Sequence, residues 1–579
     1  MMNRQNNLSI INHEQRVQKL TKTKEFFFHS GLIVLAAVLF AASFPNIITK
    51  NGFSFAAWFA YIPILIVIRK YNIFLCAIWG IIYGIAAYSL FNYWLGAFHP
   101  AAGLIAYSVY AVYLALVFML FKLADIFFEK RAFLVQWLIW LSYEYLRTQG
   151  FLGYAYGITG YSQWQFLHLI QIAGITGVWG VSALVTFPSF WLFGAFNKEF
   201  LPRTTLTNTN NENIFYNRFV RFVWFAVKNN KIPAVIWLIM LAATLIYGFI
   251  NINNYSSEIK AGSYRTAQIA LVQHNSDPWA ASRAHLHWQK IEAYRNDLTI
   301  LKRLSDEALA SNPKPQMVVW PETAFIPRIY WHTTYRDDQE SWSIVKELLE
   351  YLSDKDAPFL IGNDDARMDL NRNRIDYNAA MLFENGINTA VYRKIHLVPF
   401  TEHFPYKKTF PKIYQWLINS DTHFWEKGTE ETIFQGPGFK FSSPICFEDT
   451  FGYLSRNFTL KGAELFINMS NDAWADSLVS QKQHLGMSVF RSVENSRPAV
   501  RSTVSGQTAF IDPAGRIISE AAPFTETWIN ASVPIINQQK TTIYTKYGDF
   551  LGIFFCFTAG LLLIFGAVWY IIGKRKIRK

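Results

Sequence analysis

Three side chains in the second half of the chain are of the types that acyl transfer requires. Glu322 lies in the segment MVVWPETAF, Lys394 in VYRKIHLVPF and Cys446 in FSSPICFEDTF. Each belongs to or follows a run of apolar and β-branched residues typical of a buried strand, so each is expected near a strand end. Taken singly, each has an ordinary structural explanation: Glu322 as a loop carboxylate, Lys394 as a surface lysine and Cys446 as a core cysteine. Only the set of three predicts a catalytic site.

The chemistry of a cysteine nucleophile explains why these types belong together. A thiol with a reference pKa of about 8.5 is mostly protonated at neutral pH and needs a base, which we assign to Glu322. The carbonyl that sulfur attacks develops negative charge, which a cation and a backbone amide can stabilise. We assign these roles to Lys394 and to the backbone amide of Phe447. A lysine near the thiol is also expected to lower the thiol pKa.

An α/β domain is expected to position these residues, because strand-like and helix-like segments alternate over residues 266–530. Strands are expected at 266–273, 316–320, 359–362, 377–383, 389–392, 438–444 and 465–469, and helices at 282–304, 341–352 and 479–496. Cys446 is the only cysteine of this region, since Cys76 and Cys556 lie in apolar stretches. An internal disulfide is therefore excluded there.

The rest of the chain has the composition of a membrane protein. Hydrophobic residues make up 51% and charged residues 16% of the chain, against about 25% charged residues in a soluble protein. Eight apolar segments are long enough to cross a bilayer with some tilt. These spans are predicted at 26–45, 53–68, 72–95, 101–124, 133–148, 166–196, 232–251 and 550–572.

The basic residues predict the orientation of these spans. Lysine and arginine gather in alternate loops, at 16–24, 69–70, 130–131, 198–231 and 574–579, which the positive-inside rule places in the cytoplasm. The predicted domains are a cytoplasmic tail (1–25), a seven-helix membrane domain (26–251), an extracytoplasmic catalytic domain (252–549) and a last helix with a basic cytoplasmic tail (550–579). These loops account for the net charge of +13, so nucleic-acid binding is not expected.

Two features of the membrane half have more than one interpretation. Glu144 and Arg147 lie at i and i+3 on one helix face, where they form either a mutual ion pair or a contact for a polar lipid headgroup. Residues 215–228 alternate basic and aromatic side chains and fit a helix lying on the inner leaflet.

Longer segments around the three side chains resemble a known superfamily. WPET, YRKIHLVPF and PICFED are similar to the three blocks of the nitrilase (carbon–nitrogen hydrolase) superfamily. This resemblance implies an α-β-β-α sandwich with Glu322, Lys394 and Cys446 as its catalytic set. With seven spans before it and one after it, the whole chain resembles the apolipoprotein N-acyltransferase family. Matching segments are EYLR (144–147), GYSQ (160–163), LVPFTEHFP (397–405), NDAW (471–474), RSVENSRP (491–498), RST (501–503) followed by Gly506, and YTKYGD (544–549).

That resemblance implies a ping-pong reaction in the bacterial inner membrane. A phospholipid would donate an acyl chain to Cys446, and the thioester would pass it to the α-amino group of the diacylglyceryl-cysteine of an apolipoprotein. The catalytic domain would face the periplasm, and a monomer is expected. Glu402 is then the partner of Lys394, and Glu448 supports the nucleophile loop. Trp474 and Tyr406 are candidate lipid contacts. For all four residues the alternative is simple packing or a surface salt bridge.

The chain departs from the family pattern at three places. Tyr154-Ala155-Tyr156 replaces Phe-Pro-Trp, Thr401 replaces the glycine before Glu402, and Ala475 replaces an aromatic residue after NDAW. These departures bear on donor and acceptor preference more than on the chemistry.

No cofactor or metal is expected. The spacing of Asp472, His484, His396 and His403 matches no known metal site, and a thioester mechanism needs no metal.

Three other functions were weighed against acyl transfer. A membrane-tethered amidase would use the same three residues on an envelope or secreted amide, with water as the acceptor. A lipoprotein-binding scaffold would have lost its activity, although its catalytic set is intact in sequence. A transporter is disfavoured because the apolar segments contain few charges.

Overall fold

A computed structural model describes residues 23–98, 100–195, 231–277, 286–404, 406–419 and 423–577. The chain divides into two compact units. The first comprises Met1–Tyr143, Ala183–Ile239 and Phe554–Lys579, and the second comprises Glu144–Ser182 and Met240–Ile553. Residues 144–182, which the sequence analysis assigned to the membrane domain, therefore group with the α/β region. The predicted surface helix at 215–228 and most of the basic loop at 198–231 lie outside the described residues.

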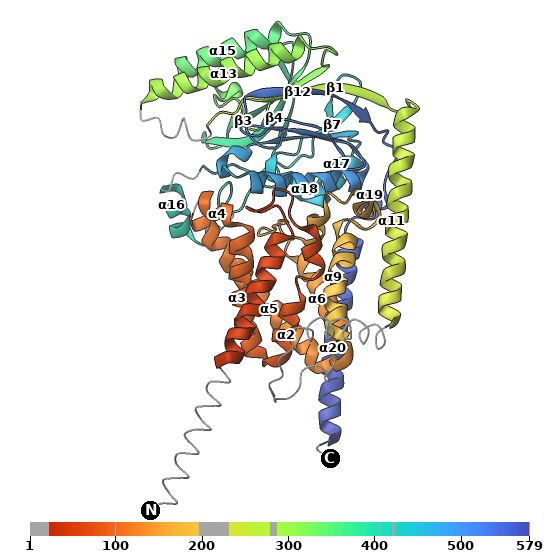
Figure 1. Cartoon of the computed structure of the whole chain (residues 1–579). Helices are drawn as coiled ribbons and strands as arrows, with labels where there is room; N and C mark the ends of the chain where they lie inside the picture. The colour runs from red at the N-terminus through yellow and green to blue at the C-terminus, as the bar shows by residue number, and fades with distance from the viewer. Residues whose placement is uncertain are drawn as a thin grey trace, which may run out of the picture. The chain divides into compact units, whose positions relative to one another are not determined.

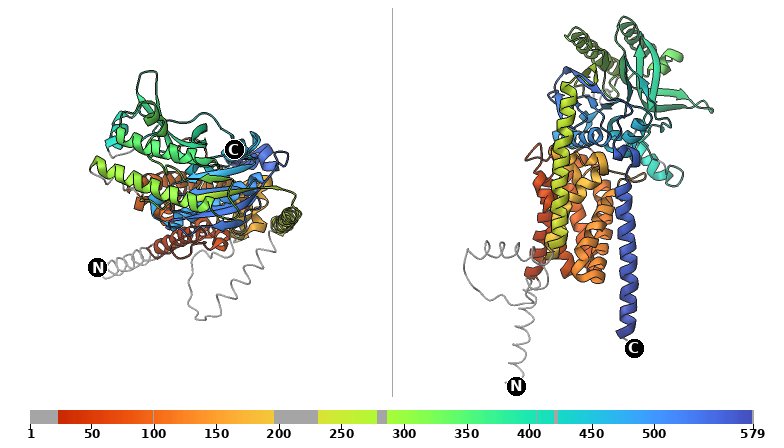
Figure 2. Two further views of the ribbon diagram at one scale, coloured as in Figure 1. Left: turned by 90° about the horizontal axis from the view of Figure 1, so that it is seen from above. Right: turned by 90° about the vertical axis from the view of Figure 1, so that its right-hand side faces the viewer.

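Within the described residues, five helices are long and apolar enough to cross a membrane: Thr23–Ala42, Ile73–Phe91 (α3), Ala102–Phe128 in α5 (Pro100–Phe128), Lys231–Lys260 (α11) and Phe550–Gly573 in α20 (Phe550–Ile577). Figure 2 shows α11 and α20 as long helices. The other three predicted spans form shorter elements. Residues 53–68 contain η1 (Ser54–Trp58) and most of α2 (Ile62–Lys70), and residues 133–148 lie mostly in α6 (Ala132–Leu146). Residues 166–196 contain α7 (Leu167–Ile170), α8 (Ala173–Thr176) and α9 (Val178–Ala195). The remaining short elements here are α4 (Tyr93–Phe98), η2 (Glu129–Arg131) and η3 (Thr159–Gln163).

Helices α3 and α5 of the first unit approach each other closely through small residues. A Cβ atom added at Gly80 would lie 2.4 Å from the carbonyl oxygen of Leu114, and one at Gly84 would lie 2.8 Å from that of Tyr110. Small residues at helix contacts are typical of packing in membranes, where dispersion replaces the hydrophobic effect. The rings of Tyr88 and Tyr110 stack with centroids 3.6 Å apart.

The second unit contains two six-stranded sheets, with strand orders β12-β1-β2-β3-β4-β5 and β11-β10-β9-β8-β7-β6. The first sheet contains β1 (Arg265–Gln273), β2 (Met317–Val319), β3 (Phe359–Met368), β4 (Arg374–Glu384), β5 (Ile387–Arg393) and β12 (Thr527–Ile535). The second contains β6 (Phe434–Gln435), β7 (Lys440–Ser442), β8 (Leu465–Ser470), β9 (Ala499–Thr503), β10 (Ala509–Ile511) and β11 (Ile517–Glu520). None of the strands after residue 495 is among those expected from the sequence.

Helices cover the outer face of each sheet, which gives the α-β-β-α layering. Figure 1 shows α13 (His287–Leu309) and α15 (Gln339–Ser353) over one sheet, and α17 (Gly452–Leu460) and α18 (Leu478–Asn495) over the other. Apolar side chains of α13, α15 and the first sheet form one core with fully buried Trp320. Shorter helices are α14 (Ile329–Thr334), α16 (Pro411–Asn419), α19 (Ile543–Tyr547), η4 (Cys446–Thr450) and η5 (Asp472–Ala475).

Strand direction brings the functional loops to one edge of the sandwich. β1, β2 and β3 are parallel, and β5 runs in the same direction because it is antiparallel to β4, which is antiparallel to β3. In the other sheet β7, β8 and β9 are parallel. The loops after β2, β5, β7 and β8 therefore start at carboxyl ends of strands, where α/β folds place their sites.

Candidate active site

Cys446 begins a tight turn after β7. It is the first residue of η4, only 8% exposed, and has a backbone φ of 50°. A left-handed conformation is uncommon for a non-glycine residue and persists only where surrounding contacts hold it. Here the side-chain amide of Asn468 donates to the carbonyl oxygens of Pro444 (3.1 Å) and Cys446 (3.3 Å). We call residues 444–450 the nucleophile turn.

Glu448 fastens the nucleophile turn to the loop that follows β5. Its fully buried carboxylate accepts hydrogen bonds from the backbone amides of Ile395 (2.7 Å), His396 (2.9 Å) and Ile445 (2.8 Å). The Tyr392 hydroxyl donates to the same group at 2.8 Å. Burial raises the pKa of Glu448 to about 7. The supporting role predicted for Glu448 thus corresponds to a bridge between the loops of Cys446 and Lys394.

Lys394 lies between two carboxylates. Its fully buried Nζ is 3.2 Å from Glu322 Oε1 and 2.8 Å from Glu402 Oε1. Burial acts to lower the pKa of Lys394, but the negative charges of Glu322 and Glu402 outweigh it and hold the pKa well above its usual value. The ammonium group of Lys394 thus pairs with both carboxylates, and Glu402, the partner expected from the sequence, is the nearer of the two.

Glu322 is held by contacts from three further elements. Oε1 accepts from the Asn378 side chain (2.8 Å), and Oε2 accepts from the backbone amide of Asn471 (2.8 Å). Strand β3 passes so close that a Cβ atom at Gly362 would lie 2.4 Å from the carbonyl oxygen of Pro321 and 2.8 Å from the Cα of Glu322. The carboxylate is thus fixed before any substrate arrives.

The electrostatics of the thiol differ from the sequence expectation. Burial raises the pKa of Cys446 well above its usual range, and the charge of Glu322 adds to this effect. Lys394 acts in the predicted direction, lowering the pKa, but is outweighed. The resting thiol is consequently protonated, and a reaction at sulfur requires a base to remove its proton.

The segment Tyr154-Ala155-Tyr156, which differs from the family pattern, lies against the nucleophile turn. The rings of Tyr154 and Tyr156 stack with centroids 5.0 Å apart, and Tyr154 stacks on Phe447 at 6.3 Å. In the described part of the chain, the backbone amide of Phe447 donates no hydrogen bond. The role expected for this amide, donation to a substrate oxygen, needs an N–H group without a partner in the protein.

The remaining candidates occupy different surroundings. Glu144 accepts a hydrogen bond from the backbone amide of Thr159 (3.0 Å), and Arg147 donates to the carbonyl oxygen of Tyr156 (2.7 Å). Both side chains are buried and hold the 154–159 loop. Trp474 is half-buried in η5, whereas Tyr406 is 47% exposed and packs its ring 5.7 Å from that of Phe151.

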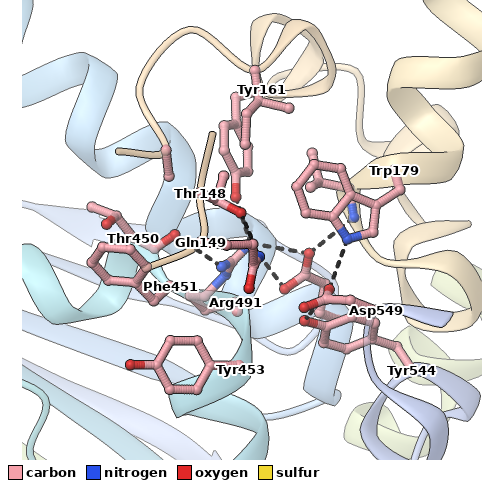
Figure 3. A pocket seen from close by; sticks show the side chains of 15 residues that line it. Thr148, Gln149, Tyr161, Trp179, Thr450, Phe451, Tyr453, Arg491, Tyr544 and Asp549 are labelled. Carbon is pink, nitrogen blue, oxygen red and sulfur yellow. Dashed lines mark hydrogen bonds and ion pairs between the residues drawn. The ribbon is translucent and has the colours of Figure 1, made fainter. Parts of the chain in front are cut away.

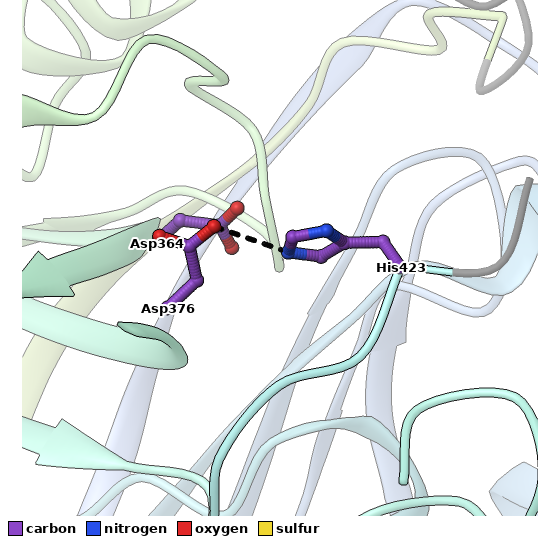
Figure 4. A group of neighbouring side chains, drawn as sticks. All are labelled: Asp364, Asp376 and His423. Carbon is purple, nitrogen blue, oxygen red and sulfur yellow. Dashed lines mark ion pairs between the residues drawn. The ribbon is translucent and has the colours of Figure 1, made fainter. Parts of the chain in front are cut away.

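Among the described residues, one group of side chains could in principle hold a metal ion: Asp364, Asp376 and His423 (Figure 4). Cations of the protein already pair with it, since Arg328 lies 2.9 Å from Asp376 and Arg374 lies 3.2 Å from it. The His423 ring is 3.3 Å from the same carboxylate. The His423 contact ties the segment after residue 422 to strand β4, which carries Asp376.

Sequence reasoning missed two buried polar groups beside the nucleophile turn. One comprises Asp449, Asp472, His484 and Arg501, of which all but His484 lie in the segments PICFED, NDAW and RST that carry the family resemblance. The other lines a small pocket centred on Arg491 (Figure 3). Arg491 lies 2.9 Å from the Tyr161 hydroxyl and 2.9 Å from Glu494, and burial raises the pKa of Glu494 to about 7. A signal was present in the sequence, because arginine and glutamate three residues apart share a helix face.

Comparison with known proteins gives two family matches. Residues 268–540 match the carbon–nitrogen hydrolase family, and residues 36–191 match the apolipoprotein N-acyltransferase N-terminal domain. The chain is 42% identical to "Apolipoprotein N-acyltransferase 1" of Treponema denticola over 571 residues, covering 96% of this chain and 98% of that protein. It is also 42% identical to "Apolipoprotein N-acyltransferase 1" of Treponema pallidum over 560 residues, covering 94% and 96%. The solved structure of Nit3 from Saccharomyces cerevisiae is 18% identical with a TM-score of 0.33, covering 47% of this chain and 90% of that one.

Proposed function

Because this chain belongs to the apolipoprotein N-acyltransferase family, we propose that it moves an acyl chain from a phospholipid to the α-amino group of the N-terminal diacylglyceryl-cysteine of lipoproteins. The observation that carries the proposal is the 42% identity over 96% of the chain, which includes the membrane part as well as the α/β domain. The buried arrangement of Glu322, Lys394 and Cys446 supports it, because these groups suit a thioester mechanism.

In the first half-reaction Glu322 takes the proton of the Cys446 thiol, and the sulfur attacks the ester carbonyl of a phospholipid. Lys394 and the backbone amide of Phe447 stabilise the negative charge that develops on the carbonyl oxygen. The ester bond breaks, the proton passes from Glu322 to the departing alkoxide, and a lysophospholipid leaves. The acyl chain remains on Cys446 as a thioester.

In the second half-reaction the free amine of the diacylated lipoprotein attacks the thioester carbonyl. Glu322 takes a proton from the amine, the carbon–sulfur bond breaks, and the proton returns to the thiolate. An amide and the starting enzyme result. Glu402 keeps Lys394 in place throughout. Glu448 keeps the nucleophile turn against the loop that follows β5 and carries Lys394, which we call the lysine loop.

Burial of the site favours an amine acceptor over water. Cys446 and Glu322 are 8% and 5% exposed and Lys394 is fully buried. A thioester in a site closed to water persists until the lipoprotein amine arrives. We assign the aromatic side chains Trp474 and Tyr406 to lipid-chain contact. We assign Glu144 and Arg147 to shaping the 154–159 loop beside Phe447, which we call the tyrosine loop.

The membrane topology is part of the same proposal. The protein is a multi-pass membrane protein, and we assign it eight spans by adding residues 53–68, α6 and α9 to the five long helices. Both termini then face the cytoplasm, and residues 252–549 face the periplasm of a bacterial inner membrane. The domain bounds 1–25, 26–251, 252–549 and 550–579 follow from this orientation, and we assign a monomer.

Intact-mass spectrometry of the purified protein in phospholipid micelles tests the reaction. The wild type is expected to gain one fatty-acyl mass and then to triacylate an added diacylated lipopeptide. Cys446→Ala is expected to do neither, whereas Cys556→Ala, a cysteine of α20, should behave as the wild type. Hydrolysis of small amides without an acyl-enzyme would instead indicate the tethered amidase. Folded protein that does neither would indicate an inactive scaffold.

A further inference from the structure

Four charged side chains form a buried charge cluster behind the nucleophile turn: Asp449, Asp472, His484 and Arg501. Each is at most 5% exposed. The His484 ring reaches both carboxylates, with Nε2 at 2.6 Å from Asp449 Oδ1 and Nδ1 at 3.3 Å from Asp472 Oδ1. Arg501 pairs with the same two acids, bonding Asp449 and lying 3.5 Å from Asp472. Charges are this deeply buried only where opposite charges compensate them.

The members of the cluster come from the elements that carry the catalytic groups. Asp449 belongs to η4, three residues after Cys446, and Asp472 begins η5, directly after the Asn471 amide that donates to Glu322. His484 lies on α18 and Arg501 on β9. The imidazole ring of His484 therefore links the nucleophile turn to the loop whose Asn471 amide holds Glu322.

We assign His484 as an imidazolium, because each of its two ring nitrogens lies beside a carboxylate oxygen. Only a doubly protonated ring can donate to two carboxylates at once. Burial acts to lower the pKa of His484, but Asp449 outweighs it, and the pKa rises to about 9. Arg501 Nη2 lies only 3.3 Å from Nδ1, and the two carboxylates compensate this approach of two cations. The cluster then carries two positive and two negative charges and is neutral.

The outer contacts of the cluster complete this arrangement. The Ser488 hydroxyl donates to Asp449 at 2.9 Å and the Ser470 hydroxyl to Asp472 at 2.7 Å. The ring of Tyr156 packs 6.2 Å from that of His484. Across α18, η4, η5, β9 and the tyrosine loop, the ionisable groups around His484 are thus Asp449, Asp472, Arg501 and Tyr156.

We propose that His484 is a positioning residue for acyl transfer, whose charge fixes the nucleophile turn against the Asn471 loop and neutralises Asp472 beside the thiol. This inference rests on the proposed function and deepens it. Cys446 is surrounded by the charges of Glu322, Lys394, Asp472 and Glu402, and Asp472 acts to raise the thiol pKa. Loss of the imidazolium leaves Asp472 less compensated. The thiol then gives up its proton less readily, and the side chains of Cys446 and Glu322 lose their fixed spacing.

The test measures acyl-enzyme formation by the full-length protein in phospholipid micelles, as a function of pH and donor concentration. For His484→Gln we expect an acylation rate about 10²-fold lower at saturating donor, an unchanged half-saturating donor concentration and a pH–rate profile moved to higher pH. The matched control is Arg497→Gln. Arg497 is a fully buried cation that donates to the carbonyl oxygens of Ala463 (3.0 Å) and Lys540 (2.8 Å), away from the cluster. It should lose thermal stability but keep the wild-type profile.

A second variant separates positioning by charge from simple folding. Asp472→Asn removes the charge that opposes thiol ionisation, so its profile should move to lower pH. Asp472→Asn combined with His484→Gln should lie between the two single variants. A His484→Gln protein with the wild-type rate and profile overturns the inference. So does a loss of rate that Arg497→Gln shares at equal thermal stability, or a set of profiles that does not move. Absence of an acyl-enzyme on the wild type would overturn the proposed function itself.

Discussion

Glu448→Gln keeps the shape of a fully buried side chain but replaces one acceptor oxygen by an NH₂ donor. In the native protein Oε1 accepts from the amides of Ile395 and His396, and Oε2 accepts from the amide of Ile445. Whichever way the new amide group is oriented, its NH₂ faces at least one backbone N–H. That N–H then has no acceptor. The orientation that loses fewer hydrogen bonds has the NH₂ at the Oε2 position and leaves only the backbone N–H of Ile445 without an acceptor.

An unpaired buried N–H costs about 1–3 kcal/mol. The cost falls on the link between the nucleophile turn and the lysine loop, so Cys446 and Lys394 lose their fixed spacing. A displacement of about 1 Å at a reacting group slows a reaction by about 10²-fold. We therefore expect Glu448→Gln to form its acyl-enzyme about 10²-fold more slowly and to unfold at a lower temperature.

The assay follows the acyl-enzyme by intact mass at saturating phospholipid, with thermal unfolding measured on the same preparation. Glu431→Gln is the matched control, because Glu431 also accepts a side-chain hydrogen bond (Asn457, 2.8 Å) and pairs with Lys461 (3.0 Å), but lies near the surface. The control should keep the wild-type rate. If Glu448→Gln acylates and unfolds like the wild type, Glu448 does not hold the turn and the reasoning is wrong.

Three further outcomes are expected. Gly362→Ala, whose Cβ would meet the Pro321 carbonyl at 2.4 Å, should slow acylation by displacing Glu322, whereas Gly174→Ala, with its nearest atom at 3.4 Å, should not; equal rates would contradict this. Lys394→Met should leave the carboxylates of Glu322 and Glu402 facing each other, lower the free energy of unfolding by about 3–5 kcal/mol and abolish the acyl-enzyme. Adding Glu402→Gln should restore thermal stability but not acylation. Restored acylation would refute the role of Lys394. The pKa of Glu494 is about 7 in the folded protein and about 4.3 in the unfolded chain. The contribution of protonated Glu494 to the free energy of unfolding is therefore complete below about pH 4.3 and is lost as the pH rises through 7. The unfolding temperature of the wild type relative to Glu494→Gln should therefore decline from pH 5 to 8, and a constant difference would contradict the assignment.

The fold of the α/β unit was largely predictable wherever a local pattern extended over a whole element. The runs before Glu322 and Lys394 predicted strands, and β2 and β5 are found there. Among the strands after residue 495, β10 and β11 are only three and four residues long, too short for a clear alternating pattern. The nine-residue β12 pairs with β1, more than 250 residues earlier in the chain, so its place in the sheet depends on a distant neighbour. Membrane helix length was less predictable. Hydropathy alone does not reveal that a turn with Gly177 at φ 65° divides residues 166–196.

By itself the sequence determined which residue types stand at the strand ends and which segments are apolar, because both properties are local. It therefore predicted Glu322, Lys394 and Cys446 as a set. Only the tertiary structure decided the partners of these side chains and the net direction of the thiol pKa. Glu448 meets the amide of Ile395 across 53 residues, and Asp449 meets His484 across 35. Such contacts, and the burial that raises the pKa of Cys446, exist only when the sheets and α18 pack together.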